Sequence, residues 1–484
     1  MTQNYNQLFK WNELTFENPQ YIRYLRITGQ ANKGLLELGE VALFDLEGNR
    51  VNLSASASPL FDEQETVPEK TTYYDSAYFD EIYHPRTAWE HIRGIEPYEI
   101  SHPPLGKLIM GVGIRLFGMT PFGWRFMGTL FGVGMLPLLY VFLKNLFGRT
   151  SIATCGTVLL AADFMHLTQT RLATIDTYAF FFILLMYYFM YRYLTLPAGA
   201  PFRKCALPLF LSGLFWGIGA ASKWTVIYGC TGLVVLYFIG LYQKLRDWPA
   251  DGETGARQPG RLKWAFQILA FSVLVFALIP AAIYTLSYLP YAWAEGDSSL
   301  TGLVGAMWEN QKYMLSYHSG VTDTHPYSSR WYQWLFDIRP ILYYMDNSVP
   351  GYTTRFAAFV NPVVCWGGLL AVLACAVQAV RRRCARALFI VIGYLAQLVP
   401  WFFIGRITFA YHYFPSVLFL ILALCYVFYS LSEQEELIAW KPAMYAVTAG
   451  AAALYALFYP VLVGIQIPSW YGTCLLRWLP SWPF

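Results

Sequence analysis

The chain has 484 residues, of which 56% are hydrophobic, 18% aromatic and only 13% charged. A soluble domain carries about a quarter charged residues, so this composition excludes an ordinary soluble protein and favours a membrane protein. The net charge of +4, without a dense basic arm, gives no reason to expect a nucleic-acid partner. The eight cysteines form no CxxC pair, which argues against a zinc site or a disulfide framework.

Residues 1–70 are predicted to form part of a β-sandwich. YIRYLRIT and ELGEVALFDLEGNRV alternate as strands do, and Glu47-Gly48-Asn49 is typical of a turn. The segment is too short for a whole sandwich, which needs about seven strands. The first residues, MTQNYNQLFKWNEL, are polar, so we expect neither a signal peptide nor a membrane anchor there.

From about residue 122 the chain becomes a series of long apolar runs, within a membrane domain that we place at 71–470. A membrane helix needs ~20 such residues, so the fold class is mainly α, a polytopic helix bundle. The predicted spans are 122–143, 151–168, 173–194, 205–222, 225–243, 264–288, 357–380, 387–404, 408–430 and 442–465. Two stretches interrupt them, a polar one at 244–263 and a long aromatic one at 290–356.

Lysine and arginine gather in alternate loops, which marks those loops as cytoplasmic by the positive-inside rule. The cations concerned are Lys144, Arg149, Arg192, Arg203, Lys204, Lys244, Arg246, Arg257, Arg261, Lys263, Arg381, Arg382, Arg383, Arg386 and Lys441. The 1–121 region and the 290–356 loop fall on the opposite side. The unusual sequence is therefore expected to face outward.

Asp80 and Glu81, in YFDEIYHP just before the first predicted span, are candidate catalytic residues. Adjacent carboxylates close to a membrane surface are costly to desolvate, which favours a functional role. A base that takes a proton from a hydroxyl must be anionic and must lie beside the acceptor. For the pair alone, a solvated loop with two acids is the simpler interpretation.

The motif SHPPLGKL, residues 101–108, contains His102 and Lys107. Pro-Pro fixes an extended turn, and LGKLIMGVGIRLFGM is predicted to form a helix in the membrane interface. Lys107 falls in the first turn of that helix, where the helix dipole disfavours a cation, so we expect an anion beside it. A snorkelling lysine is the alternative.

Lone cations stand at the outer ends of otherwise apolar helices, namely Arg125, Arg171, Lys223 and Arg406. In lipid such residues must pair or face water. Asp163 and Asp176 could neutralise some of them. Together with Lys107, however, the cations outnumber these two acids, and the surplus favours a bound anion, with phosphate the natural candidate.

The 290–356 loop, with His325, and the segment Tyr411-His412-Tyr413 mix aromatic and polar residues. Such residues suit sugar stacking or peptide contact, and suit an interfacial aromatic belt equally well. The histidines lack paired ligand spacing, and Asp80-Glu81 lack a third ligand, so we expect neither a metal nor another cofactor.

The motifs taken together resemble the protein O-mannosyltransferases, polytopic glycosyltransferases of the C-type fold. The resemblance spans residues 75–430 in order, through FDEIYHPRTAWEHIRGIEPYEISHPPLGKLIMGVGIRLFG, FGWRFMGTLFG, RLATID, ASKWT, HPYSSRWYQWLFDIRPILYY and FAYHYFP. It implies a polyprenyl-phosphate-mannose donor, and transfer with inversion to Ser or Thr hydroxyls of translocated proteins. The 290–356 loop is too short for the large soluble domain of eukaryotic members, so a bacterial form in the plasma membrane is expected.

The resemblance also implies residue roles. Asp80 would be the general base, and Glu81 would position donor or acceptor. Arg125, Lys223 and Arg406 would hold the lipid phosphate with Lys107 nearby, and supporting roles would fall to His102, Arg171, Asp176, His325 and His412. Cations of this kind stabilise the phosphate that leaves an oxocarbenium-like transition state, without a metal.

One further departure from the family pattern and three alternatives remain. The family usually has one more membrane helix before the Asp80 loop, where this chain resembles the tail of a discoidin-type, galactose-binding-like sandwich, so we expect an N-terminally short chain. The acceptor could instead be a lipid or an envelope glycan. A lipid-sugar transporter is less favoured, because its charges would lie at the membrane midplane. The third alternative is a sugar-sensing protein whose sandwich fragment binds glycan without catalysis. The Asp80 loop argues against it, because binding alone would not require that loop.

Overall fold

The computed structural model describes residues 11–16, 21, 23–28, 38–51, 58–69, 73–75, 77–249, 260–322, 324–434 and 440–484. The chain divides into two compact units, Met1–Ala77 and Tyr78–Phe484. In the first unit the predicted turn is confirmed: the Asp45 N–H donates to the Asn49 carbonyl at 2.9 Å, and Gly48 has a φ of +82°. The described part of 21–28 contains no strand, contrary to the prediction, and Phe44 and Arg50 form an isolated bridge.

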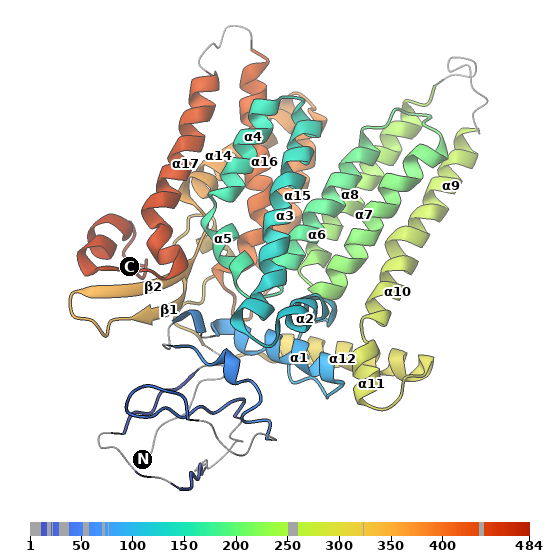
Figure 1. Cartoon of the computed structure of the whole chain (residues 1–484). Coiled ribbons are helices and arrows are strands. Elements are labelled where there is room, and N and C mark those ends of the chain that lie inside the picture. The colour runs from blue at the N-terminus through green and yellow to red at the C-terminus, as the bar shows by residue number, and fades with distance from the viewer. Residues whose placement is uncertain are drawn as a thin grey trace. The chain divides into compact units, whose positions relative to one another are not determined.

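The second unit is a bundle of long helices, as predicted, because in lipid a helix satisfies all backbone hydrogen bonds within one segment. Its helices are α1 His84–Arg93, α2 Leu105–Phe117, α3 Pro121–Phe147, α4 Thr150–Ala161, α5 Phe164–Arg171, α6 Asp176–Leu194, α7 Phe202–Ser222, α8 Val226–Arg246, α9 Arg261–Val273, α10 Ile279–Leu286, α11 Leu289–Ala294, α12 Leu300–Gly320, α13 Trp331–Trp334, α14 Pro362–Arg381, α15 Ala385–Leu398, α16 Phe414–Ser432 and α17 Trp440–Val463. Figure 1 shows α1, α2, α11 and α12 gathered at one end of the long helices.

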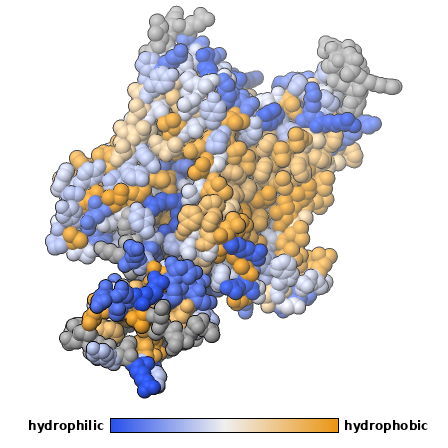
Figure 2. All heavy atoms as spheres, viewed as in Figure 1, coloured by the Kyte–Doolittle hydropathy of each residue, from blue (hydrophilic) through white to orange (hydrophobic). Residues whose placement is uncertain are grey.

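Eight helical segments of the described chain are long and apolar enough to cross a membrane, or nine if the bent pair α4 and α5 is one span. The predicted span 173–194 is the 19-residue helix α6, which is not among these eight and is buried among its neighbours. Figure 2 shows apolar side chains covering the flank of the bundle formed by α9 and α10. Exposed residues there include Leu262, Phe266, Leu269, Val273, Leu274 and Leu278.

The predicted span 151–168 is not a single straight helix, because the chain bends by 57° between α4 and α5. Asp163 lies at the break in an extended conformation and caps α5, accepting the His166 N–H at 2.9 Å. Its other oxygen accepts the Asn361 N–H at 2.9 Å. Asp163 therefore accepts hydrogen bonds from backbone donors and forms an ion pair with none of the described cations.

The 290–356 segment, predicted as a loop, folds into α11, α12, α13 and most of a β-hairpin. Strands β1 Ile341–Asp346, β2 Tyr352–Ala358 and β3 Gln466–Pro468 form an antiparallel sheet in the order β1-β2-β3. The register between β1 and β2 shifts from Leu342 to Tyr344, so Tyr343 is the extra residue of a bulge. Bulges redirect side chains, and the Tyr343 ring lies against Phe79, next to Asp80.

Candidate active site

Asp80 and Glu81 lie in a single 3-10 turn, Phe79–Ile82, that precedes α1. The Glu81 side chain is fully buried and accepts four hydrogen bonds. Arg125 of α3 donates from Nε to Oε1 and from an Nη to Oε2, both at 2.8 Å. The Ala173 N–H donates to Oε1 at 2.8 Å and the Tyr78 N–H to Oε2 at 3.1 Å. With both oxygens engaged, Glu81 fixes the turn in place.

Asp80 has a different environment from its neighbour. Its side chain is partly exposed, and its carboxyl forms no hydrogen bond or ion pair with the part of the chain that the structure describes. Burial raises the pKa of Asp80 to about 6; His84 and Lys223 oppose this rise, whereas Asp176 and Glu99 reinforce it. A carboxylate with this pKa is anionic at neutral pH and is a stronger base than an ordinary aspartate.

Two predicted cations, Lys223 and Arg406, contribute positive charge to this end of the bundle. Lys223 follows α7 and donates to Asp176, at the start of α6, at 2.6 Å, and its Nζ lies 5.5 Å from the centre of the Tyr411 ring. Arg406 is half-buried, and its only bond to the described residues is a 3.5 Å contact with the Ile407 carbonyl. Arg406 therefore retains donors for an anion.

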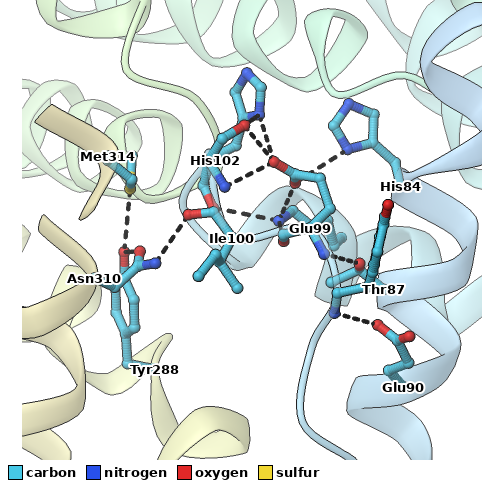
Figure 3. Close-up of polar contacts among 12 residues, drawn as sticks. His84, Thr87, Glu90, Glu99, Ile100, His102, Tyr288, Asn310 and Met314 are labelled. Atoms are coloured by element: carbon cyan, nitrogen blue, oxygen red, sulfur yellow. Dashed lines mark hydrogen bonds and ion pairs between the residues drawn. The ribbon is translucent and has the colours of Figure 1, made fainter. Parts of the chain in front are cut away.

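Glu99 is the centre of a second polar cluster, which sequence reasoning missed (Figure 3). Its carboxylate forms an ion pair with Lys107 and a 3.1 Å hydrogen bond with His102 Nδ1. It also lies 3.7 Å from His84 Nδ1. Burial disfavours the charged form, yet Lys107 and His102 hold the pKa of Glu99 well below its usual range. Burial also lowers the pKa of His102 to about 3, so its imidazole is neutral at neutral pH.

The anion expected beside Lys107 is therefore Glu99. Lys107 is fully buried; its Nζ forms an ion pair with the Glu99 carboxylate and donates to the Glu99 and His102 carbonyls. The carboxylate balances the charge of the ammonium, and the two carbonyls accept two of its three N–H donors. The predicted contact of Lys107 with a donor phosphate has no support in this geometry.

Helix α12 holds the 99–102 segment from the other side (Figure 3). Asn310 Nδ2 donates to the Ile100 carbonyl at 2.8 Å, and Asn310 Oδ1 accepts the Tyr288 hydroxyl at 2.8 Å. His318 Nε2 lies 2.9 Å from the Ser101 carbonyl. Sequence reasoning missed Asn310, because its partner Ile100 lies 210 positions away.

The other predicted supporting residues lie against aromatic rings and backbone groups. Arg171 lies over the Phe356 ring at 5.2 Å and 3.5 Å from the Leu462 carbonyl. His325 packs against Phe79 and Phe409 with ring centres 5.7 and 5.2 Å apart. His412 is buried between tryptophan rings, and its Nδ1 accepts the Phe409 N–H at 3.1 Å.

The predicted surplus of cations is smaller than the sequence count implied. That count considered only Asp163 and Asp176, whereas Glu81 neutralises Arg125 and Glu99 neutralises Lys107. Glu99 could have been found from the sequence, since it is an acid eight positions before a lysine that required an anion. In the described chain Arg406 remains a cation without an ion pair.

Two family models match the chain. The first, dolichyl-phosphate-mannose-protein mannosyltransferase, covers residues 118–294, and the second, the C-terminal four-helix membrane region of protein O-mannosyltransferase, covers 303–482. The polyprenol-phosphate-mannose–protein mannosyltransferase of Mycolicibacterium smegmatis is 26% identical over 461 residues, 84% of this chain and 87% of that protein. The enzyme of that name from Mycobacterium tuberculosis is 26% identical over 489 residues, 90% of this chain and 88% of that protein.

Solved structures agree at the level of the fold. The Saccharomyces cerevisiae Pmt1-Pmt2 complex bound to the sugar donor superposes with a TM-score of 0.73 at 14% identity, covering 85% of this chain and 90% of that chain. ArnT from Cupriavidus metallidurans superposes with a TM-score of 0.50 at 17% identity, covering 80% of this chain and 62% of that chain. Fold and site thus define a polytopic membrane glycosyltransferase of the C-type fold. The chain belongs to the protein O-mannosyltransferase family.

The buried pair of Lys107 and Glu99 predicts a large, coupled loss of stability. Glu99→Gln or Lys107→Met alone should each cost about 3–5 kcal/mol of unfolding free energy, because each leaves an uncompensated buried charge. The double variant should lose less than the sum of the two single losses. Denaturant titration in detergent micelles measures all three.

The exposed α12 pair Lys312–Glu309 provides the control, because Glu309→Gln and Lys312→Met should leave stability almost unchanged. Additive losses in the Glu99 and Lys107 cycle would show that the two charges do not stabilise each other.

Proposed function

We propose that the protein transfers mannose from a polyprenyl-phosphate donor to Ser or Thr hydroxyls of translocated proteins, with Asp80 as the general base. The observation that carries this proposal is the Asp80 carboxyl, half-open and without a partner in the described chain, beside a turn that buried Glu81 fixes. The sugar and the acceptor come from the names of the mycobacterial relatives, and the family supports both.

The chemistry requires a base on one face of the sugar and a leaving group on the other. The acceptor oxygen forms a bond to the anomeric carbon while its proton passes to Asp80. The bond between that carbon and the phosphate oxygen breaks, and its electron pair leaves with the phosphate. Attack opposite to the leaving group inverts the anomeric configuration.

Arg406 and Lys223 are the cations that we assign to the donor phosphate. Arg406 has free donors among the described residues, and Lys223, although paired with Asp176, lies close enough to act on Asp80. Cations fixed before the reaction stabilise the charge that develops on the leaving phosphate. Arg125 contributes indirectly, because it holds Glu81.

We place the site on the outer face of the bacterial plasma membrane. Asp176 begins α6 and Lys223 follows α7, so the opposite ends of these helices lie away from the site. The cationic loop 192–204 joins those opposite ends. By the positive-inside rule that loop is cytoplasmic and the site is external.

Asp80→Asn should abolish transfer while donor binding is retained, because the amide cannot accept the proton but has almost the same shape. The assay uses purified protein in lipid, radiolabelled polyprenyl-phosphate-mannose and a peptide rich in Ser and Thr. Asp247→Asn, an exposed acid at the end of α8, is the matched control and should keep full activity. Near-normal turnover of Asp80→Asn would exclude Asp80 as the base.

Activity should fall with decreasing pH around pH 6. The raised pKa means that Asp80 is protonated below about pH 6, and a protonated carboxyl cannot take the hydroxyl proton. Below that pH, kcat/KM should drop about tenfold per pH unit. A profile that stays flat down to pH 4 would show that the titrating base is an ordinary, solvated carboxylate.

Arg406→Ala should weaken donor binding about 10- to 100-fold, because a hydrogen bond to a charged group contributes about 1.5–3 kcal/mol. Binding of the labelled donor lipid to protein in nanodiscs measures the effect. Arg115→Ala is the matched control, since it removes an exposed cation from α2. Equal donor affinity in the two variants would remove Arg406 from the phosphate site.

A further inference from the structure

Phe79, the residue before Asp80, has an unusual backbone conformation. Its φ is +49°, in the left-handed region that a bulky side chain rarely adopts. Among the described residues other than glycine, only Asp337 and Arg383 also have positive φ. Such a conformation costs free energy and persists only where surrounding contacts enforce it.

The contacts that enforce it surround the Phe79 ring. Phe409 lies 5.1 Å from its ring centre and Tyr411 5.9 Å, both in the segment after Arg406. Tyr343, the bulge residue of β1, and His325 each lie 5.7 Å away. These are the spacings of favourable edge-to-face and tilted aromatic pairs, so the pocket stabilises one position of the ring.

Contacts of Tyr78, before Phe79, and of Glu81, two residues after it, also fix the chain here. The Tyr78 ring packs against Tyr344 and Phe356 with centres 5.8 and 5.5 Å apart. The Glu81 carboxylate is bound by Arg125. If Phe79 adopted a negative φ, the chain after it would turn away, and the Tyr78 and Glu81 contacts could not both be kept.

We propose that Phe79 is a positioning residue for catalysis: its ring, held in this aromatic pocket, maintains the positive φ of residue 79 that leaves the Asp80 carboxyl open while Glu81 is bound to Arg125. The proposal rests on the proposed function, because it assigns Phe79 a role through Asp80. A residue needed only to fill space would pack equally well at an ordinary φ.

The decisive comparison is between Phe79→Ala and Phe79→Gly in the mannose-transfer assay. Alanine removes the ring but still disfavours positive φ, so kcat should fall about a hundredfold, the effect of a displacement of roughly 1 Å at a reacting group. Glycine also removes the ring, yet it adopts positive φ freely. The kcat of Phe79→Gly should therefore be about tenfold higher than that of Phe79→Ala. The KM for donor should change little in either variant.

A purely space-filling role predicts the opposite order, because glycine leaves the larger cavity and the more flexible chain. Turnover of Phe79→Gly at or below that of Phe79→Ala, or normal turnover of Phe79→Ala, would overturn the proposal. Arg383 provides the matched control: it is exposed and has the same φ of +49°. Arg383→Ala and Arg383→Gly should differ in melting temperature but not in kcat.

The wild-type protein is measured in the same assay, so absence of any wild-type transfer refutes the proposed function rather than the role of Phe79. Melting temperature with and without donor lipid reports folding of each variant. If Phe79→Ala does not fold, Phe79→Leu replaces it. For Phe79→Leu, the pH below which kcat/KM falls (the acid limb of the profile) should lie below pH 6, because Asp80 becomes more solvated. The groups acting on that limb remain His84, Lys223, Asp176 and Glu99. An unchanged limb with normal kcat would contradict the proposal.

Discussion

The buried pair of Glu81 and Arg125 is the interaction on which the site depends. Two adjacent carboxylates repel each other, and burying either costs free energy unless it is paired and hydrogen-bonded. Arg125 and two backbone N–H groups satisfy Glu81 completely, and those partners belong to α3, to the link before α6 and to the turn itself. With the turn fixed at these points, the charge of Asp80 can remain without a partner and available to a substrate.

The lysines near the site are also paired with acids, whereas Arg406 is not. Lys107 is paired with Glu99 and Lys223 with Asp176, so an acid holds each of these two lysines in place. Arg406, which has no acidic partner in the described chain, adds the positive charge that a phosphate group would balance. A site arranged in this way gains a favourable electrostatic interaction when an anionic donor binds, and gains more as the phosphate leaves with additional charge.

The sequence predicted the helical bundle and placed Asp80, Glu81, Lys223 and Arg406 at one end of it, because hydropathy and loop charge depend on local composition. The bend at Asp163 was not predictable, since an acid inside an apolar run resembles a buried ion-pair partner as much as a helix cap. Glu99 was missed although Lys107 required an anion. The φ of Phe79 could not be predicted at all, because rings far along the chain impose it.

The central segment between α10 and α14 serves as the scaffold for both parts of the site. Its helix α12 holds the Glu99 loop through Asn310 and His318, and the bulge of β1 brings Tyr343 against Phe79. The turn with Asp80 precedes both regions matched by the family models, 118–294 and 303–482. Glu81 nevertheless binds Arg125 in the first region, and Phe79 packs against Phe409 in the second. The turn that carries Asp80 is therefore positioned by contacts with both regions, and its geometry depends on how they pack together.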